Sequence, residues 1–531
     1  MKPKTSPFFY FVIALFFIAI LYSLVCGVND LGLNQPYPYF LPGIFLVLFL
    51  GTWLVVNSLS SISAQLRLED RLNRYKTVTN AVEIGLVIVV LAAAAWVRII
   101  VIQTIPMEPS SDFATYYDVA DLLKQGTLKD NAWYCDYIAI FPHVYGYPRI
   151  LSVVFRLFGT SVAVAKYLNV IFSVATVFLV YLIGRLCGGR IAGCIAMLLS
   201  AFWPSQLIYI TQVASEYPFS FLLMLCIYLF VLSLKICTAD MKHPALGILL
   251  HIALGISLAV CASVRPMALI AVITIFLCIF FQKIPILSSK DERKSISLML
   301  LSKGWIRCTI VLVCYLLISN LNTTVIEHTI DRTLASGSTS FGYNLLVGMN
   351  TVSNGSWNAE DFQYLFDRYQ ETGDASEAHS ACLDLTIERL KQESPRSIFN
   401  LIMKKYHNLW GNDNFGVYWN LNFLYEQGNL TPELEQKLYS FYAVGDLFYL
   451  LCVAFSGITG IFLWFKGNDY AYIFILVYIG TAGMHLFVES QNRYHYHALL
   501  MLALLAGISI SEIHQMNRAK VLKKKLADNQ I

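Results

Sequence analysis

Long apolar segments dominate this sequence and leave it few ways to fold. The 531 residues are 57% hydrophobic and only 14% charged, whereas ordinary soluble domains carry about 25% charged residues. About 20 consecutive apolar residues cross a bilayer as a helix, because a helix satisfies all its backbone hydrogen bonds internally. The sequence therefore predicts an all-α, polytopic membrane protein. We expect about twelve transmembrane helices, at residues 8–27, 38–57, 83–105, 165–186, 190–208, 217–235, 245–262, 267–283, 305–325, 443–465, 469–487 and 497–513.

The distribution of charge indicates the orientation of these helices. With the N-terminus inside, the cytosolic connections hold more than half of the Lys and Arg residues, and most of the Asp and Glu residues fall outside. Lys and Arg accumulate in cytosolic loops, so both termini are expected in the cytosol. Membrane topology and anionic lipids explain the basic clusters, and we expect no nucleic-acid partner. The first span lacks a small-residue cleavage site and is expected to be retained.

Two long polar segments, 106–164 and 326–442, interrupt the spans on the outer side. The first should begin with a helix that Ser110 or Ser111 caps and that ends at Gly126. The chain then divides into 1–82 (two helices and a cytosolic connector), 83–325 (a transmembrane core with the first outer loop), 326–442 (a small outer subdomain) and 443–531 (three helices and a basic cytosolic tail).

Two acids stand at the outer ends of hydrophobic segments. Asp112 lies near Tyr116 and Tyr117, where a carboxylate can act as a general base. An acid in the first turn of a helix also interacts favourably with the helix dipole, by about 0.3–1 kcal/mol. Glu216 precedes Pro218 at the outer start of the sixth span, and an acid at membrane depth costs free energy unless it is paired or used. Both acids are candidates for catalysis, and helix capping is the alternative role.

Several cations on the outer side are candidates for binding phosphate. Arg265 lies in a tight outer turn and needs an anionic partner, either one of the two acids or a lipid phosphate. Lys404 and Lys405 lie on a predicted amphipathic helix, 396–410, whose alternative role is a solvated face. Arg493 and Tyr494 lie at the outer start of the last span, where an interface anchor is the alternative. An arginine suits phosphate because its fork binds two oxygens at once.

The histidines and cysteines show no recognised metal-binding spacing. His143, His495 and His497 lie on the outer side, but two residues of separation place the last two on different sides of a helix. Only Cys135 and Cys382 lie clearly in the outer segments, and a disulfide between them stays open. Neither a Gly-rich phosphate loop nor a cytosolic Asp-x-Asp motif is present. We therefore expect an activated donor that arrives through the membrane.

The order of short motifs over residues 84–513 resembles the integral-membrane glycosyltransferases of the GT-C superfamily. Within it, the pattern is most similar to bacterial relatives of protein O-mannosyltransferases and lipid A aminoarabinose transferases (glycosyltransferase family 39-like). The motifs are Ser111-Asp112-Phe113 to Tyr117, Tyr147-Pro148, Leu157-Phe158-Gly159, Ser215-Glu216-Tyr217-Pro218, Arg265-Pro266, residues 342–357, and Glu489 to Tyr494.

This resemblance implies a hexosyltransferase of the cell (plasma) membrane that moves a sugar from a polyprenyl-phosphate-linked donor to an envelope lipid, wall polymer or protein. The reaction would take place on the non-cytosolic face, among membrane lipids, with inversion. A phosphate leaving group needs cations and no general acid, so this scheme requires no cofactor and leaves a divalent metal ion open.

The resemblance also distributes roles among the candidate residues. Asp112 would activate the acceptor, with Glu216 as the second catalytic candidate. The donor-binding candidates are Arg265, Lys404, Arg493 and Tyr494, and the candidates for contacting sugar or acceptor are Tyr116, Tyr117, His143 and Tyr145. Many protein O-mannosyltransferases carry adjacent acids on this loop, whereas Ser111 and Phe113 flank Asp112 here. This departure argues against a protein hydroxyl as the acceptor.

Two other functions fit parts of the pattern. A polymerase or ligase of lipid-linked oligosaccharides would rely chiefly on the outer arginines and would not need Asp112. A transporter or lipid flippase would place its charges within the helix bundle, on Arg98, Lys166 and His251, and often shows repeated halves. The charges of this chain gather near the outer ends, and no internal repeat is visible, which favours an enzyme.

Overall fold

The computed structural model of the protein describes residues 6–33, 40–66, 68, 74–238, 244–281, 304–337, 340–468 and 470–528. All regular secondary structure in these ranges is helical. The helices, with η marking a 3-10 helix, are α1 (Pro7–Leu33), α2 (Phe40–Gln65), α4 (Lys76–Thr104), α5 (Asp112–Gln125), η1 (Leu128–Asp130), α6 (Ala132–Ile140), η2 (Pro142–Tyr145), α7 (Gly146–Phe158), α8 (Val162–Ala201), α9 (Pro204–Ile208), η3 (Tyr209–Thr211), α10 (Glu216–Thr238), α11 (Pro244–Val264), α12 (Ala268–Phe281), α14 (Gly304–Ile330), α15 (Gly342–Gly348), α16 (Ala359–Thr372), α17 (Ala375–Gln392), α18 (Pro395–Trp410), α19 (Phe415–Glu426), α20 (Pro432–Lys466), α21 (Tyr472–Phe487), η5 (Asn492–His495) and α22 (Tyr496–Asp528).

The long apolar helices confirm the predicted class, a polytopic all-α membrane protein. Within the described ranges, nine helices are long and apolar enough to cross a membrane, and α12 and α21 are shorter apolar helices. Each predicted span overlaps one of these helices. Two of the spans share the 40-residue α8, which is broken at Gly189, where φ is +85°. A Cβ on Gly184 would lie 2.9 Å from Gly193 Cα, so the two halves of α8 fold back against each other.

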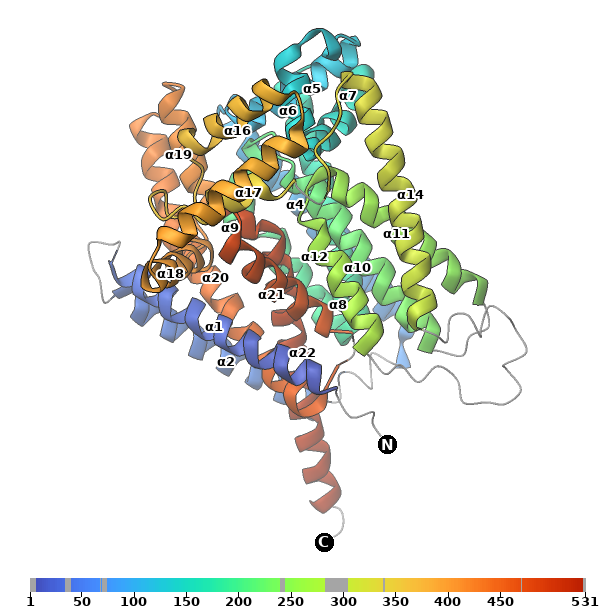
Figure 1. Ribbon diagram of the computed structural model, residues 1–531. Helices are drawn as coiled ribbons and strands as arrows, with labels where there is room; N and C mark the ends of the chain where they lie inside the picture. The colour runs from blue at the N-terminus through green and yellow to red at the C-terminus, as the bar shows by residue number, and fades with distance from the viewer. Residues whose placement is uncertain are drawn as a thin grey trace.

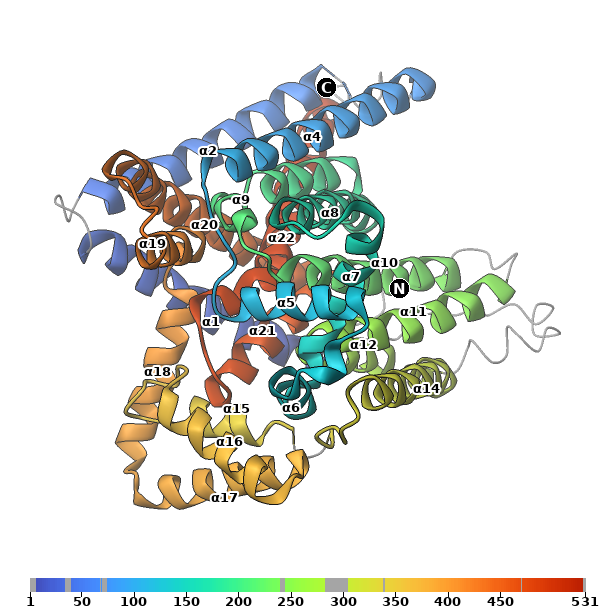
Figure 2. The same cartoon turned by 90° about the horizontal axis from the view of Figure 1, so that it is seen from above.

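The two polar segments gather at one end of the bundle. Figure 1 shows α5, α6 and α7 beside α16 and α17 at the top, whereas α22 ends at the bottom. Seen from above, α5 lies near the middle and α17 at one edge (Figure 2). Segments more than 200 residues apart therefore share one face, as the predicted topology requires. The N-in, C-in orientation itself stays a prediction from the charges.

The start of the first polar segment differs from the predicted capping. α5 begins at Asp112 and ends at Gly126, which adopts φ +77° as expected for a helix stop. The predicted serine cap is wrong, because Ser111 has φ +52° and makes no side-chain cap bond. The Ser110 hydroxyl instead accepts a hydrogen bond from Gln427 Nε2 at 2.7 Å.

The two cysteines of the outer segments form no disulfide with each other, and both thiols are free. Cys135 lies on α6 and Cys382 on α17, and both are buried. The Cys135 thiol donates to the Leu128 carbonyl oxygen at 3.3 Å. Each thiol therefore packs as a small apolar group in its own helix.

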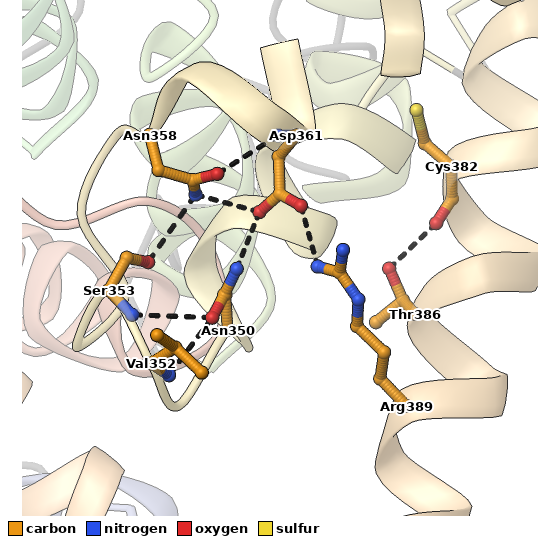
Figure 3. Close-up of polar contacts among 8 residues, drawn as sticks. All are labelled: Asn350, Val352, Ser353, Asn358, Asp361, Cys382, Thr386 and Arg389. Atoms are coloured by element: carbon orange, nitrogen blue, oxygen red, sulfur yellow. Dashed lines mark hydrogen bonds and ion pairs between the residues drawn. The ribbon is translucent and has the colours of Figure 1, made fainter. Parts of the chain in front are cut away.

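The second polar segment is organised around a buried carboxylate. Asp361 is fully buried and accepts hydrogen bonds from Asn350 and Asn358, both at 2.8 Å, and from Arg389 at 2.6 Å (Figure 3). Asn358 also caps α16 by accepting the Asp361 amide. This network joins α16, α17 and the loop between α15 and α16. The predicted helix 396–410 of this segment is confirmed as α18, which begins one residue earlier than expected.

Candidate functional site

Two ion pairs form the centre of the candidate site. Arg493 Nη2 lies 2.7 Å from Asp112 Oδ2, and Arg265 Nη1 lies 2.9 Å from Glu216 Oε1. Arg493 and Glu216 are almost completely buried, whereas the Asp112 side chain is 45% exposed. Four of the residues singled out in the sequence therefore meet at one end of the bundle, although Asp112 and Arg493 are 381 positions apart.

The ring of Tyr494 connects the two ion pairs. The Arg265 guanidinium lies 5.6 Å from its centroid and the Arg493 guanidinium 5.7 Å. Arg493 also lies 4.6 Å from the Trp419 ring and 5.1 Å from the Phe113 ring. Cations attract aromatic faces within about 6 Å. Three rings thus hold Arg493 in place, and two guanidinium groups share one small region.

Glu216 has further hydrogen-bonding capacity within this region. Its Oε1 atom accepts the Tyr209 hydroxyl at 3.3 Å, and its Oε2 atom is buried without a partner among the described residues. The preceding Ser215 hydroxyl donates to the Tyr116 hydroxyl oxygen at 3.3 Å. Burial raises the pKa of Tyr116, so this phenol is neutral at pH 7. The predicted sugar-site residue Tyr116 therefore does reach the cluster.

The site contains a further acid, Glu489, to which the sequence motifs assigned no catalytic or binding role. It lies between α21 and η5 and accepts a hydrogen bond from Gln491 Nε2 at 2.7 Å. Burial raises the pKa of Glu489, and the negative charge of Asp112 raises it further. The sequence carried a usable signal, since Glu489 stands at the outer end of an apolar span just as Glu216 does. The site thus contains three carboxylates and two guanidinium groups.

His143 also belongs to the electrostatic environment of the site. Burial lowers its pKa to about 4, and the charge of Arg265 contributes to the same direction. The imidazole is therefore neutral at pH 7 and keeps one donor and one acceptor nitrogen.

Three other predicted residues make their contacts elsewhere. Lys404 is exposed, and its ammonium reaches Asn354 Oδ1 at 3.3 Å. The Tyr117 ring packs on Phe155, and the Tyr145 hydroxyl lies 3.5 Å from Thr329 Oγ1.

The remaining outer histidines have partners within the protein. His495 Nε2 lies 3.0 Å from Asp413 Oδ1, and the same carboxylate accepts Trp203 Nε1 at 2.5 Å and Ser205 Oγ at 2.6 Å. His497 Nε2 lies 3.0 Å from Thr481 Oγ1. In the described part of the chain, no three His, Cys, Asp or Glu side chains are grouped as metal ligands. Asp413 lies between α18 and α19, so the carboxylate connects His495 on η5 with Ser205 on α9 and acts as a structural contact.

The charged residues that a transporter would use are bonded to backbone. Arg98 donates to the carbonyl oxygens of Ala94 and Ala201, at 3.0 and 2.9 Å. Lys166 Nζ lies 2.5 Å from the Met107 carbonyl oxygen, and His251 Nδ1 lies 2.7 Å from that of Gly247. The Arg98–Ala201 and Lys166–Met107 contacts connect neighbouring segments of the bundle, whereas the other two lie within α4 and α11.

Comparisons with known proteins give distant structural neighbours. No protein-family model matches the sequence, and no curated protein matches it. The chain is similar to the archaeal oligosaccharyltransferase AglB from Archaeoglobus fulgidus in complex with an inhibitory peptide and a dolichol-phosphate, with TM-score 0.43, 14% identity, and coverage of 84% of this chain and 52% of that chain. An Archaeoglobus fulgidus oligosaccharyltransferase in the apo form gives TM-score 0.43 and 14% identity, over 80% of this chain and 50% of that one.

A second neighbour is ArnT from Cupriavidus metallidurans bound to undecaprenyl phosphate, with TM-score 0.29, 11% identity, and coverage of 81% of this chain and 78% of that chain. The chain spans about half the length of AglB.

Proposed function

We propose that the protein is a glycosyltransferase that moves a sugar from a polyprenyl-phosphate-linked donor to an acceptor of the cell envelope, on the non-cytosolic face of the plasma membrane. The observation that supports this most is the pairing of Arg493 with Asp112 and of Arg265 with Glu216 around the Tyr494 ring. Cleavage of a sugar–phosphate bond requires cations for the departing phosphate and a carboxylate for the attacking hydroxyl. The cluster contains both.

In this proposal, Arg265 and Arg493 bind the phosphate of the donor. A guanidinium can donate two parallel hydrogen bonds to phosphate oxygens. Arg493 Nε is buried without a partner among the described residues, so this side chain keeps a donor for an incoming anion. The departing phosphate is a weak base, and the two positive charges stabilise it without a general acid. Glu216, almost completely buried beside Arg265, orients that guanidinium.

Asp112 acts as the base. It is the most accessible charged group of the two ion pairs, with 45% of its side chain exposed, so an acceptor hydroxyl can reach it. A phosphate bound to Arg493 would compete with Asp112 and release the carboxylate for catalysis. The hydroxyl proton passes to Asp112 while the hydroxyl oxygen attacks the anomeric carbon. The bond from that carbon to the phosphate oxygen breaks, the phosphate keeps the electron pair, and the configuration inverts.

The test uses purified protein in nanodiscs, undecaprenyl phosphate carrying labelled monosaccharides, and membrane extract as acceptor. General-base catalysis contributes about 10²–10⁴-fold, so Asp112→Asn should lose transfer by at least about 100-fold while still binding the donor. Asp130→Asn, an exposed acid of the same outer segment, is the matched control. Wild-type rates of transfer in a folded Asp112→Asn variant would refute the assignment of Asp112 as the general base.

A polymerase or ligase of lipid-linked oligosaccharides is the second candidate. One observation favours it: the two arginines are firmly held, by the rings and by Glu216, whereas Asp112 is half exposed. That reaction would depend on the arginines and tolerate Asp112→Asn. Transfer from oligosaccharide carriers, together with none from any monosaccharide carrier, would identify it.

A further inference from the structure

Lys405 is a buried lysine with three carbonyl partners. Its ammonium donates to the carbonyl oxygens of Gly348 at 2.6 Å, Val488 at 2.8 Å and Leu486 at 3.1 Å. An ammonium group has three donors, so all of them are used. Lys405 is 1% exposed, whereas its neighbour Lys404 on α18 is exposed. The sequence predicts the same role for both lysines, but only the Lys405 side chain points into the protein.

These three bonds join segments that are distant in sequence. Gly348 ends α15, and Leu486 lies in the last turn of α21, a few residues before η5. Backbone bonds continue the same contact, from the Glu489 amide to the Asn344 carbonyl and from the Ser490 amide to the Gly355 carbonyl, both at 2.9 Å. The segment 342–356 therefore lies directly against residues 486–490.

Two glycines make room for this contact. A Cβ on Gly348 would lie 2.2 Å from the Phe487 carbonyl oxygen. Gly355 has φ +73°, and a Cβ there would lie 2.6 Å from Lys405 Cδ. A larger residue than glycine at position 355 would therefore clash with the Lys405 stem, and a larger residue at position 348 would clash with the backbone of Phe487.

Burial makes an ammonium at this position unfavourable. It lowers the pKa of Lys405 to about 7, and the facing Glu489 partly offsets the effect. His485 on α21 is the other titratable group that faces the ammonium. An apolar side chain would fill this space at a lower desolvation cost. We therefore attribute the presence of a lysine to its three hydrogen bonds with backbone carbonyl oxygens.

We propose that Lys405 is a positioning residue that locks the outer segment 342–356 to residues 486–490 and thereby fixes the turn that carries Glu489 and Arg493. Arg493 follows the clamped residues by only a few positions, so the clamp sets where its guanidinium lies relative to Arg265. The kinetic part of this inference rests on the proposed function, whereas the clamp itself does not.

The first measurement is hydrogen exchange on the full-length protein in nanodiscs. Lys405→Met keeps the length of the stem and removes all three donors, and Lys391→Met, at an exposed lysine near the end of α17, is the matched control. Losing hydrogen bonds to a charged group should speed exchange by about tenfold or more in the amides of 344–356 and 486–492 of Lys405→Met alone. Exchange equal to that of the wild type would overturn the clamp.

The second measurement separates positioning from a purely structural role. In Lys405→Met, the KM for an undecaprenyl-phosphate sugar should rise about tenfold, with a smaller change in kcat, because the donor-binding Arg493 is displaced while Asp112 is intact. Lys391→Met should match the wild type. Faster exchange with an unchanged KM would overturn the positioning role and leave the proposed function untouched.

A second variant keeps the inference testable if Lys405→Met does not fold. Gly355→Ala places a methyl group against the Lys405 stem and displaces the ammonium from its carbonyl partners. It should therefore speed exchange in the same amides and raise KM as Lys405→Met does. A Gly355→Ala protein with wild-type exchange would overturn the clamp. If the wild type itself transfers no sugar, the proposed function fails, and the exchange measurement still decides the clamp.

Discussion

Replacement of Arg493 by lysine tests the anion-binding role most directly. The Arg493 side chain is 5% exposed, and its guanidinium lies 4.6 Å from the Trp419 ring centroid and 5.1 Å from that of Phe113. Lysine keeps the charge but loses the fork that matches two phosphate oxygens and the flat surface that stacks on the rings. The change therefore removes geometry and leaves net charge constant.

The expected loss follows from the second hydrogen bond of the fork. A hydrogen bond to a charged group is worth about 1.5–3 kcal/mol, and an ammonium donates one such bond where the fork donates two. We therefore expect a net loss of about 2 kcal/mol, or roughly 30-fold in Kd. The ion pair with Asp112 changes this little, because Asp112 is 45% exposed and such pairs contribute about 0–1 kcal/mol.

The assay is competition of unlabelled with labelled undecaprenyl phosphate for the protein in nanodiscs, at fixed salt. Arg396→Lys is the matched control, since Arg396 is an exposed arginine of the outer segment. A Kd within about threefold of the wild type, in Arg493→Lys protein that keeps its melting temperature, would refute the assignment of Arg493 to the phosphate. An equal loss in Arg396→Lys would show that the effect is not local.

Two further predictions concern stability. Because burial lowers the pKa of His143 from 6.5 to about 4, the unfolded chain binds more protons between these values, and stability should rise with pH across that window, by up to about 3 kcal/mol. Melting curves of the wild type and His143→Gln at several pH values check this, and an equally steep profile in the variant would contradict it. Arg389→Met removes one donor from the fully buried Asp361 and should cost about 2 kcal/mol. Arg368→Met, which breaks an exposed pair with Glu371, should change the melting temperature very little, and equal effects of the two variants would argue against the buried network.

Much of the fold could be predicted because membrane crossing is a local requirement. About 20 apolar residues must follow one another, and each predicted span overlaps an apolar helix. The predicted helix stop at Gly126 was equally local, and its φ angle is positive as expected. The serine cap of α5 failed because the φ angle of Ser111 depends on how the chain arrives from α4, which residue preferences do not encode.

The membership of the site was partly predictable, and its pairing was not. Asp112, Glu216, Arg265 and Arg493 stood out as charges at the ends of apolar segments, and all four lie in the cluster. Glu489 shared that signal, but several other acids of the outer segments are equally close to apolar runs. The sequence left three partners open for Arg265, and the structure pairs it with Glu216.

The sequence by itself determined the membrane-spanning class and which kinds of charge would stand at the outer face, because hydropathy and residue type are properties of short stretches of chain. Tertiary structure alone decided which charges meet, because contact between Asp112 and Arg493 depends on the packing of helices 381 positions apart. It also separated Lys405 from Lys404. Successive helical residues point about 100° apart, and only the packing of α18 against residues 348 and 486–488 selects the buried one.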